Sequence, residues 1–150
     1  MNNMLVETAR FGSIHIEPDK IISFKDGIPG FEDLTKFVLL SPPDFSPFHI
    51  LQSIEDGGIS LIVSDPFIFK KDYAPYISKS IFKELEIDED GQAVLFTTIV
   101  IPADYKKMTA NLMAPIIINS DKRLGKQVIL DKGDYPVRYP IFQNPDGKVG

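Results

Sequence analysis

The chain has 150 residues, of which 43% are hydrophobic and 25% charged, and this composition argues against a disordered protein. It contains no cysteine, which excludes disulfides, thiolate catalysis and cysteine-ligated metal sites. The formal net charge is −5, and residues 1–102 contain sixteen Asp and Glu residues against eight Lys and Arg residues, which favours a basic protein partner over nucleic acid.

The N-terminal sequence MNNMLVETARF lacks the basic region and long apolar run of a secretory signal. No segment approaches the roughly 20 apolar residues that a membrane span requires. We therefore expect a cytoplasmic protein with no membrane partner. The length predicts a single domain, residues 1–142, and the polar ending QNPDGKVG predicts a flexible C-terminal tail, residues 143–150.

Strand-like runs follow one another along the first two thirds of the chain. GSIHIE, residues 12–17, alternates isoleucine with polar residues, which predicts a strand with one buried face. Residues 48–65 place two apolar runs around the sequence DGG and predict a tight hairpin. QAVLFTTIVI, residues 92–101, is apolar on both faces and predicts a central strand. Further strand candidates are KIISF, residues 20–24, and KFVLL, residues 36–40.

The sequence GIPG, residues 27–30, predicts a type II turn, because Pro29 and Gly30 occupy the second and third positions that this turn favours. The GXXG clamp of KH domains has the same spacing, but that clamp joins two helices, whereas a strand-like run precedes GIPG here. We therefore expect a shaped turn that presents Phe31.

A helix is predicted over residues 72–85, DYAPYISKSIFKEL. Asp72 can cap its N-terminus, and apolar residues recur every four positions from Tyr73 to Leu85. Pro75 is compatible only with the first turn of such a helix.

Residues 111–130, NLMAPIIINSDKRLGKQVIL, predict two strands joined by a turn. The isoleucine run forms a strand buried on both faces, Asn119 starts the turn, and we expect the Asn111 amide to tie a loop to the sheet. In YPVRYPIF, residues 135–142, both prolines remove backbone donors from the same side, so this strand should lie at the outer edge of the sheet.

Many short strands at regular spacing predict a mainly β protein: a small antiparallel barrel-like or sandwich-like domain with one or two short helices. The second helical turn is expected in ADYKKM, residues 103–108. A parallel α/β sheet would need a crossover helix after most strands, and the pattern offers about one.

The sequence offers little for catalysis or metal binding. His15 alternates with isoleucines and is expected on the solvent side of a strand, and His49 has no nearby histidine partner. The acidic sequence at residues 86–91 lacks the glutamate that completes a calcium loop. Asp65 and Asp104 end apolar strands, which is ordinary turn chemistry, although a hydrolase built on such acids stays an alternative. We expect no enzyme, no cofactor and no metal.

Four segments together resemble the flagellar assembly factor FliW family, in that family's order and spacing. They cover most of the chain, and the motif of GIPGF followed by LQS and NLxAPIxIN is specific. The segments are FKDGIPGFEDL (24–34), FHILQSIEDGGISLIVSDP (48–66), TANLMAPIIIN (109–119) and GKQVIL with Tyr135 (125–135).

This resemblance implies a small, barrel-like cytoplasmic protein without enzymatic activity. It implies binding to the RNA-binding translational regulator CsrA away from its RNA surface, which keeps CsrA off the flagellin messenger. It also implies binding to flagellin, which on accumulating takes the protein from CsrA and so allows CsrA to repress translation. We expect a monomer that contacts no nucleic acid directly.

A partner switch requires mutually exclusive complexes, so the two partners should share or couple a surface. Candidate contacts combine aromatic residues with carboxylates, which suits an interface with a basic protein. They are Phe31, Glu32, Asp65, Tyr73, Tyr76, Glu84 and Glu86. The alternative is a direct RNA-binding module that uses residues 103–150, where eight Lys and Arg residues outnumber five Asp and Glu residues.

Overall fold

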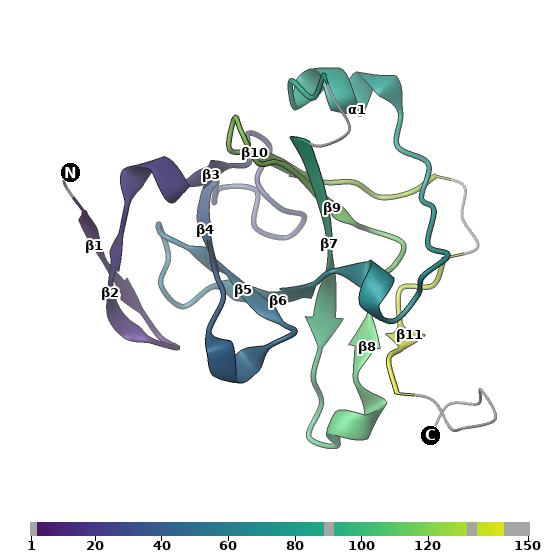
Figure 1. The fold of residues 1–150 in the computed structure, drawn as a ribbon. Coiled ribbons are helices and arrows are strands. Elements are labelled where there is room, and N and C mark those ends of the chain that lie inside the picture. Colours follow the sequence, from purple (N-terminus) through teal and green to yellow (C-terminus); the bar gives the residue numbers. More distant parts are fainter. Residues whose placement is uncertain (1–2, 89–91, 132–134, 143–150) are drawn as a thin grey trace.

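Seven strands close into a barrel that forms the body of the molecule (Figure 1). The computed structural model describes residues 3–88, 92–131 and 135–142. The strands are hydrogen-bonded in the order β7-β6-β5-β4-β3-β10-β9, and a further pairing between β9 and β7 closes the ring. Their bounds are β3 (Ile22–Ser23), β4 (Lys36–Leu40), β5 (His49–Ser53), β6 (Ser60–Ser64), β7 (Ala93–Val100), β9 (Ile116–Asn119) and β10 (Leu124–Gln127).

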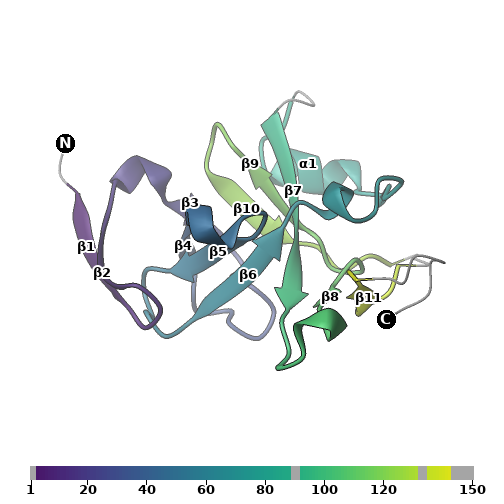
Figure 2. The same ribbon diagram turned by 60° about the horizontal axis from the view of Figure 1, so that its bottom comes forward.

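Two short strands extend the sheet beside β7, and a separate hairpin lies on the other side of the molecule. β8 (Thr109–Ala110) pairs with β7, and β11 (Tyr139–Pro140) pairs with β8 at the sheet edge. β1 (Met4–Thr8) and β2 (Gly12–Ile16) form the antiparallel hairpin. Figures 1 and 2 place it far from β8 and β11.

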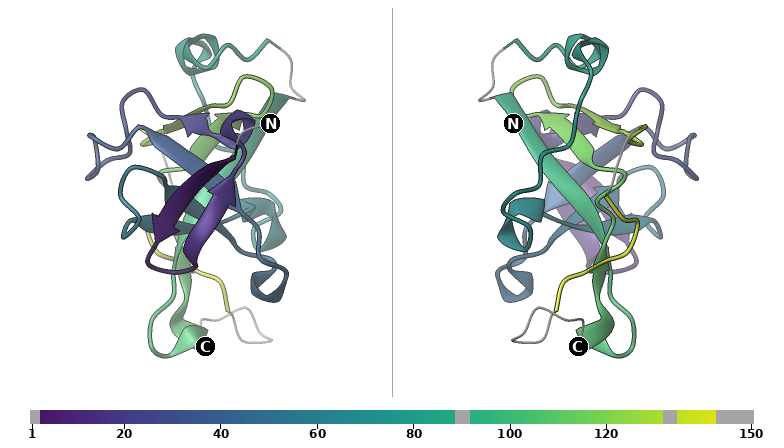
Figure 3. Two further views of the ribbon diagram at one scale, coloured as in Figure 1. Left: turned by 90° about the vertical axis from the view of Figure 1, so that its left-hand side faces the viewer. Right: turned by 90° about the vertical axis from the view of Figure 1, so that its right-hand side faces the viewer.

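One α-helix is found in the described part of the chain, α1 (Lys79–Glu84). It lies outside the barrel near β9 and β10, and it projects from the top of the body in both views of Figure 3. The 3₁₀ helices are η1 (Pro18–Lys20), η2 (Pro43–Phe45), η3 (Pro66–Ile68) and η5 (Tyr105–Lys107). In the described part of the chain, no helix has the length and apolar character that crossing a membrane needs.

The hydrophobic core falls into three parts. The barrel interior contains Phe24 and Phe37, whose rings meet edge to face with centroids 5.4 Å apart. A second cluster, which includes Tyr73 and Leu112, lies where β8 and β11 extend the sheet. In the third cluster Val6 and Ile16 of the N-terminal hairpin pack with Val38 of β4. The hairpin is therefore held to the barrel by side-chain packing.

Most of the predicted strands are confirmed. Residues 36–40 form β4, residues 48–65 form the β5–β6 hairpin, and β7 is central because it pairs with three strands. The type II turn is also confirmed, since the Phe31 amide donates to the Ile28 carbonyl at 2.7 Å and Gly30 has a φ of 92°. The last strand lies at the sheet edge as predicted, but only two of its residues pair. One pairing, β3 with β10, is parallel.

The predicted helix over residues 72–85 is wrong in its first half, because α1 begins only after Ser78. Pro75 disfavours the helical conformation for Ala74, the residue before it. The Ala74 amide instead donates to the Tyr135 hydroxyl at 2.9 Å, which ties this segment to the C-terminal part of the chain. Asp72 consequently caps no helix. Periodicity alone did not separate an extended, tethered segment from a helical one.

Two predictions fall on residues outside the described ranges. One is the flexible tail predicted for residues 143–150. The other is the interpretation of the acidic segment 86–91, of which residues 89–91 lie outside the described ranges. Both stay predictions.

Candidate protein-binding surface

An open groove runs between α1 and the end of β10, and we call it the α1 groove. It encloses about 740 Å³. Its lining comes from the segment before α1, from α1, and from β10 and the chain after it: Tyr76, Ser78, Ile81, Lys126, Gln127, Val128, Ile129 and Asp131. Tyr76 is 79% exposed and Ile129 is 57% exposed. Two large side chains left open at one groove are typical of a protein-contact surface.

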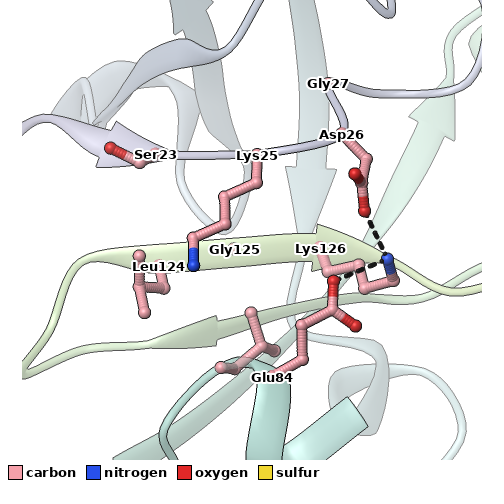
Figure 4. A pocket seen from close by; sticks show the side chains of 9 residues that line it. Ser23, Lys25, Asp26, Gly27, Glu84, Leu124, Gly125 and Lys126 are labelled. Atoms are coloured by element: carbon pink, nitrogen blue, oxygen red, sulfur yellow. Dashed lines mark hydrogen bonds and ion pairs between the residues drawn. The ribbon is translucent and has the colours of Figure 1, made fainter.

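An ion-pair cluster centred on Lys126 lies beside this groove (Figure 4). The Lys126 Nζ lies 2.8 Å from Asp26 Oδ2 and 3.0 Å from Glu84 Oε1. These contacts join the loop after β3, α1 and β10. The hydrogen bond to Asp26 raises the pKa of the Lys126 ammonium, and the same bond lowers the pKa of the Asp26 carboxyl. Two carboxylates share the Lys126 ammonium, and Lys25, which lines the same site (Figure 4), also acts on Asp26 by lowering the pKa of its carboxyl.

Replacing Lys126 with methionine should lower the melting temperature at pH 7 by about 1–2 °C, because exposed ion pairs are individually weak. The folded-state pKa of Asp26 is depressed, so its contribution is present above its unfolded pKa and is lost as the pH falls through the folded value. The Lys126 pKa is raised, so its contribution is lost as the pH rises through the folded value.

Thermal unfolding of the parent and of the Lys126→Met variant at acidic, neutral and strongly alkaline pH checks this expectation. The difference between their melting temperatures should be largest near neutral pH and should shrink in high salt. Lys79→Met provides the control, since Lys79 is an exposed lysine of α1 that forms no ion pair with any described residue. A Lys126 effect that is independent of pH and salt would contradict the ion-pair explanation.

Asn119, at the end of β9, attaches the C-terminal end of α1 to the barrel. Its side chain is fully buried, and its amide nitrogen donates to the carbonyl oxygens of Leu85 and Glu86 at 2.8 and 3.0 Å. Its amide oxygen accepts from the backbone amides of Asp121 and Lys122. The predicted turn role of Asn119 is confirmed, and the contact with α1 is an additional role.

Glu86 adopts an unusual backbone conformation directly after α1. The amides of Glu86 and Ile87 donate to the carbonyls of Lys83 and Phe82, which is the Schellman arrangement of a helix C-terminus. Glu86 has a φ of 56°, in the left-handed region where glycine is favoured and other residues cost about 1–2 kcal/mol. The Glu86 carboxylate is exposed at this position.

The seven predicted contact residues lie in four different places. Tyr76 lines the α1 groove, Glu84 belongs to the Lys126 cluster, and Glu86 follows α1. Phe31 and Glu32 lie together on the type II turn, where the Glu32 carboxylate accepts from the Gly30 amide at 2.8 Å. The structure therefore brings together three of the predicted residues around α1.

Tyr73 and Asp65 have local structural roles. Tyr73 is 3% exposed, its hydroxyl donates to the Leu112 carbonyl at 2.6 Å, and burial raises its pKa. Asp65 accepts from the Phe67 amide at 2.8 Å and caps η3, just as Asp104 accepts from the Lys106 amide at 3.1 Å and caps η5. The described residues hold no group of three or more His, Asp or Glu side chains that fits a metal ion.

Sequence reasoning missed Lys126 and Ile129. Ile129 stands between Val128 and Leu130, so the sequence shows three adjacent apolar residues and does not reveal which one is exposed. Leu130 is 5% exposed, whereas Ile129 is open at the groove. Lys126 carried no signal either, because its partners lie 100 and 42 residues earlier in the chain.

Comparisons with known proteins agree on one family. The family model described as "FliW protein" matches residues 5–141, a range that includes every residue of the α1 groove. The flagellar assembly factor FliW of Alkaliphilus metalliredigens is 40% identical over 141 residues, which cover 93% of this chain and 87% of that protein. The protein of the same name from Caldicellulosiruptor bescii is 42% identical over 140 residues, covering 93% of this chain and 91% of that protein.

A solved structure supports the same relationship. The crystal structure of a flagellar assembly factor FliW matches with a TM-score of 0.90 and 33% sequence identity. The match covers 95% of this chain and 99% of the other.

Proposed function

The chain belongs to the FliW family of flagellar assembly factors, and from this premise we propose that it binds and antagonises the translational regulator CsrA. In this proposal it is a cytoplasmic protein without enzymatic activity. It occupies CsrA away from the RNA-binding surface and so keeps CsrA off the flagellin messenger. Flagellin is the second partner, and its binding releases CsrA.

The observation that supports this proposal is the composition of the α1 groove and its border. Tyr76 and Ile129 offer two exposed anchors, and a few large side chains often dominate the binding energy of an interface. Asp26 and Glu84, which share Lys126, and the exposed Glu86 add carboxylates beside them. A basic RNA-binding protein is attracted to such a border, which accelerates association.

The expected result is that Tyr76→Ala weakens the complex with CsrA from the same organism by about tenfold or more. Size-exclusion chromatography and titration calorimetry measure the complex, and a gel shift of CsrA with its RNA measures the antagonism. Tyr105→Ala is the matched control, because Tyr105 is 57% exposed but lies on η5, at the far end of β7 from α1 (Figure 1). The Tyr105 variant should bind CsrA as the parent does.

Four outcomes of these binding assays decide between the hypotheses. Absence of a complex at micromolar concentrations overturns CsrA binding, and equal losses in both tyrosine variants overturn the assignment of the α1 groove. Flagellin added to the preformed complex should release CsrA, and coexistence of all three proteins in one complex contradicts the switch. Direct, salt-dependent retention of RNA by this protein alone would instead favour the RNA-binding alternative.

A further inference from the structure

β6 and β7 separate after a short paired region, which leaves strand edges open. They pair only at Val63↔Thr98 and Ser64↔Thr97. Beyond these pairs, residues 60–62 of β6 and the end of β7 no longer pair with each other. In Figure 2, β7 runs on past β6 towards β8, while β6 turns away towards β5. Unpaired edges of this kind accept a further strand readily.

A groove of about 440 Å³ lies at this separation, and we call it the β6–β7 groove. Most of its lining is apolar and comes from three segments: the type II turn, β6, and the end of β7 with the residue after it. Val100 is 63% exposed, Phe31 is 37% exposed and Ile101 is 36% exposed. Apolar side chains beside open strand edges provide both components of strand addition, because main-chain bonds give affinity and side-chain pockets give specificity.

Arg10 is the one charged residue among those that line the β6–β7 groove. It lies in the turn of the β1–β2 hairpin, and this turn is well supported. The Thr8 hydroxyl donates to the Gly12 carbonyl at 2.8 Å and accepts from the Phe11 amide at 2.9 Å. The Ala9 amide donates to the Gly57 carbonyl of the β5–β6 hairpin at 3.0 Å. A braced turn therefore holds Arg10 at the groove, and the geometry of a guanidinium suits a carboxylate.

We propose that the β6–β7 groove binds an extended segment of another polypeptide, which adds as a strand to the open edge of β6 or β7. Alternate apolar side chains of that segment enter the groove beside Phe31 and Val100. An acidic residue of the segment pairs with Arg10. A basic segment is disfavoured because Arg10 would repel it, and a helix would leave the open strand edges unpaired.

This site is distinct from the α1 groove, and the inference does not depend on CsrA binding. The two grooves nevertheless share a wall, because Gln127 lines both of them. The Gln127 side chain donates to the Ala114 carbonyl at 3.0 Å, which holds this part of β10 in place. An occupant of either groove therefore contacts the same strand end.

The test selects short random peptides displayed on phage against the full chain and then compares their binding to the parent and to the Val100→Arg variant, whose long cationic side chain fills the groove. The selected peptides should alternate apolar residues and contain Asp or Glu. Fluorescence anisotropy should then show at least tenfold weaker binding to Val100→Arg and about fivefold weaker binding to Arg10→Glu. Tyr76→Ala, in the α1 groove, should bind them unchanged.

A charge exchange makes the test sharper. Replacing the acidic residue of a selected peptide by lysine should weaken its binding to the parent and restore its binding to Arg10→Glu. Selected peptides that are helical or basic, or that bind Val100→Arg as well as the parent, would overturn the proposal. Failure to enrich any peptide over the unselected library would also overturn it. Unchanged melting temperatures of the variants verify that each one is folded.

Discussion

Replacing Asn119 with leucine is expected to lower the free energy of unfolding by about 3–5 kcal/mol. Leucine has a similar volume, so the change removes polar contacts rather than creating a large cavity. Both donors and both acceptor sites of the buried Asn119 amide are used, and all four partners are backbone groups. The variant removes the Asn119 partner of all four groups, and the Leu85 carbonyl, whose bond to Asn119 is buried, loses its partner where water does not replace it, which is more costly than the loss of a hydrogen bond in water.

Urea denaturation measures this loss, and Asn111→Ala provides the matched control. The Asn111 side chain also accepts from two backbone amides, those of Met113 and Ala114, but it is only partly buried and spans a few residues of one turn. Its removal should cost about 1 kcal/mol. The Asn111 side chain therefore stabilises its own turn, and its side-chain hydrogen bonds among the described residues do not include the predicted tie between a loop and the sheet.

The Asn119 variant should also affect the α1 groove, since the lost contacts to Leu85 and Glu86 hold the end of α1. Relative to the parent protein, hydrogen exchange in the Asn119 variant under native conditions should be accelerated more in α1 than in β4 or β5. Equal losses of stability in the two asparagine variants would contradict the clamp between α1 and the barrel.

The elements that sequence predicted correctly are those determined by neighbouring residues. The type II turn follows from Pro29 and Gly30, and the β5–β6 hairpin follows from two apolar runs around a short glycine-containing turn. Ring closure has no local signal. It depends on β7 pairing with β9 and on β3 pairing in parallel with β10, and both pairings join strands that are far apart in the sequence. For this reason the sequence allowed a barrel or a sandwich.

The candidate site was predicted in part for a similar reason. Tyr73 and Tyr76 are the same residue type three positions apart, yet Tyr73 is 3% exposed and Tyr76 is 79% exposed. The difference arises because the segment is extended and tethered by Tyr135, whereas the helical pattern placed both residues in one helix. The carboxylates at Glu84 and Glu86 were found from local charge, but the ammonium shared by Glu84 and Asp26 was not.

Replacing Gly125 with alanine is expected to lower the free energy of unfolding by about 3 kcal/mol, at the upper end of overpacking costs. A Cβ at this position of β10 would lie 2.5 Å from the Phe24 Cζ and within 2.9 Å of two further ring carbons. The Phe24 ring is fully buried and packs edge to face on Phe37, so it has little room to retreat. Gly58→Ala is the control, because its Cβ would meet only the Asp56 carboxylate, at 3.4 Å.

A double-mutant cycle with Phe24→Leu identifies the cause of this loss. Phe24→Leu alone removes ring atoms from the core and should cost about 1–2 kcal/mol. If the Gly125 penalty is the clash with the ring, the double variant should be more stable than the sum of the two losses predicts, by at least 1 kcal/mol. Additive losses in urea denaturation would contradict the clash.

Lys126 follows Gly125 on β10, so a displaced strand would also move the Lys126 ammonium away from Asp26 and Glu84. Gly125→Ala should therefore weaken CsrA binding, and the double variant should recover part of it. The close packing of Phe24 under β10 thus contributes both to stability and to the position of the proposed binding surface.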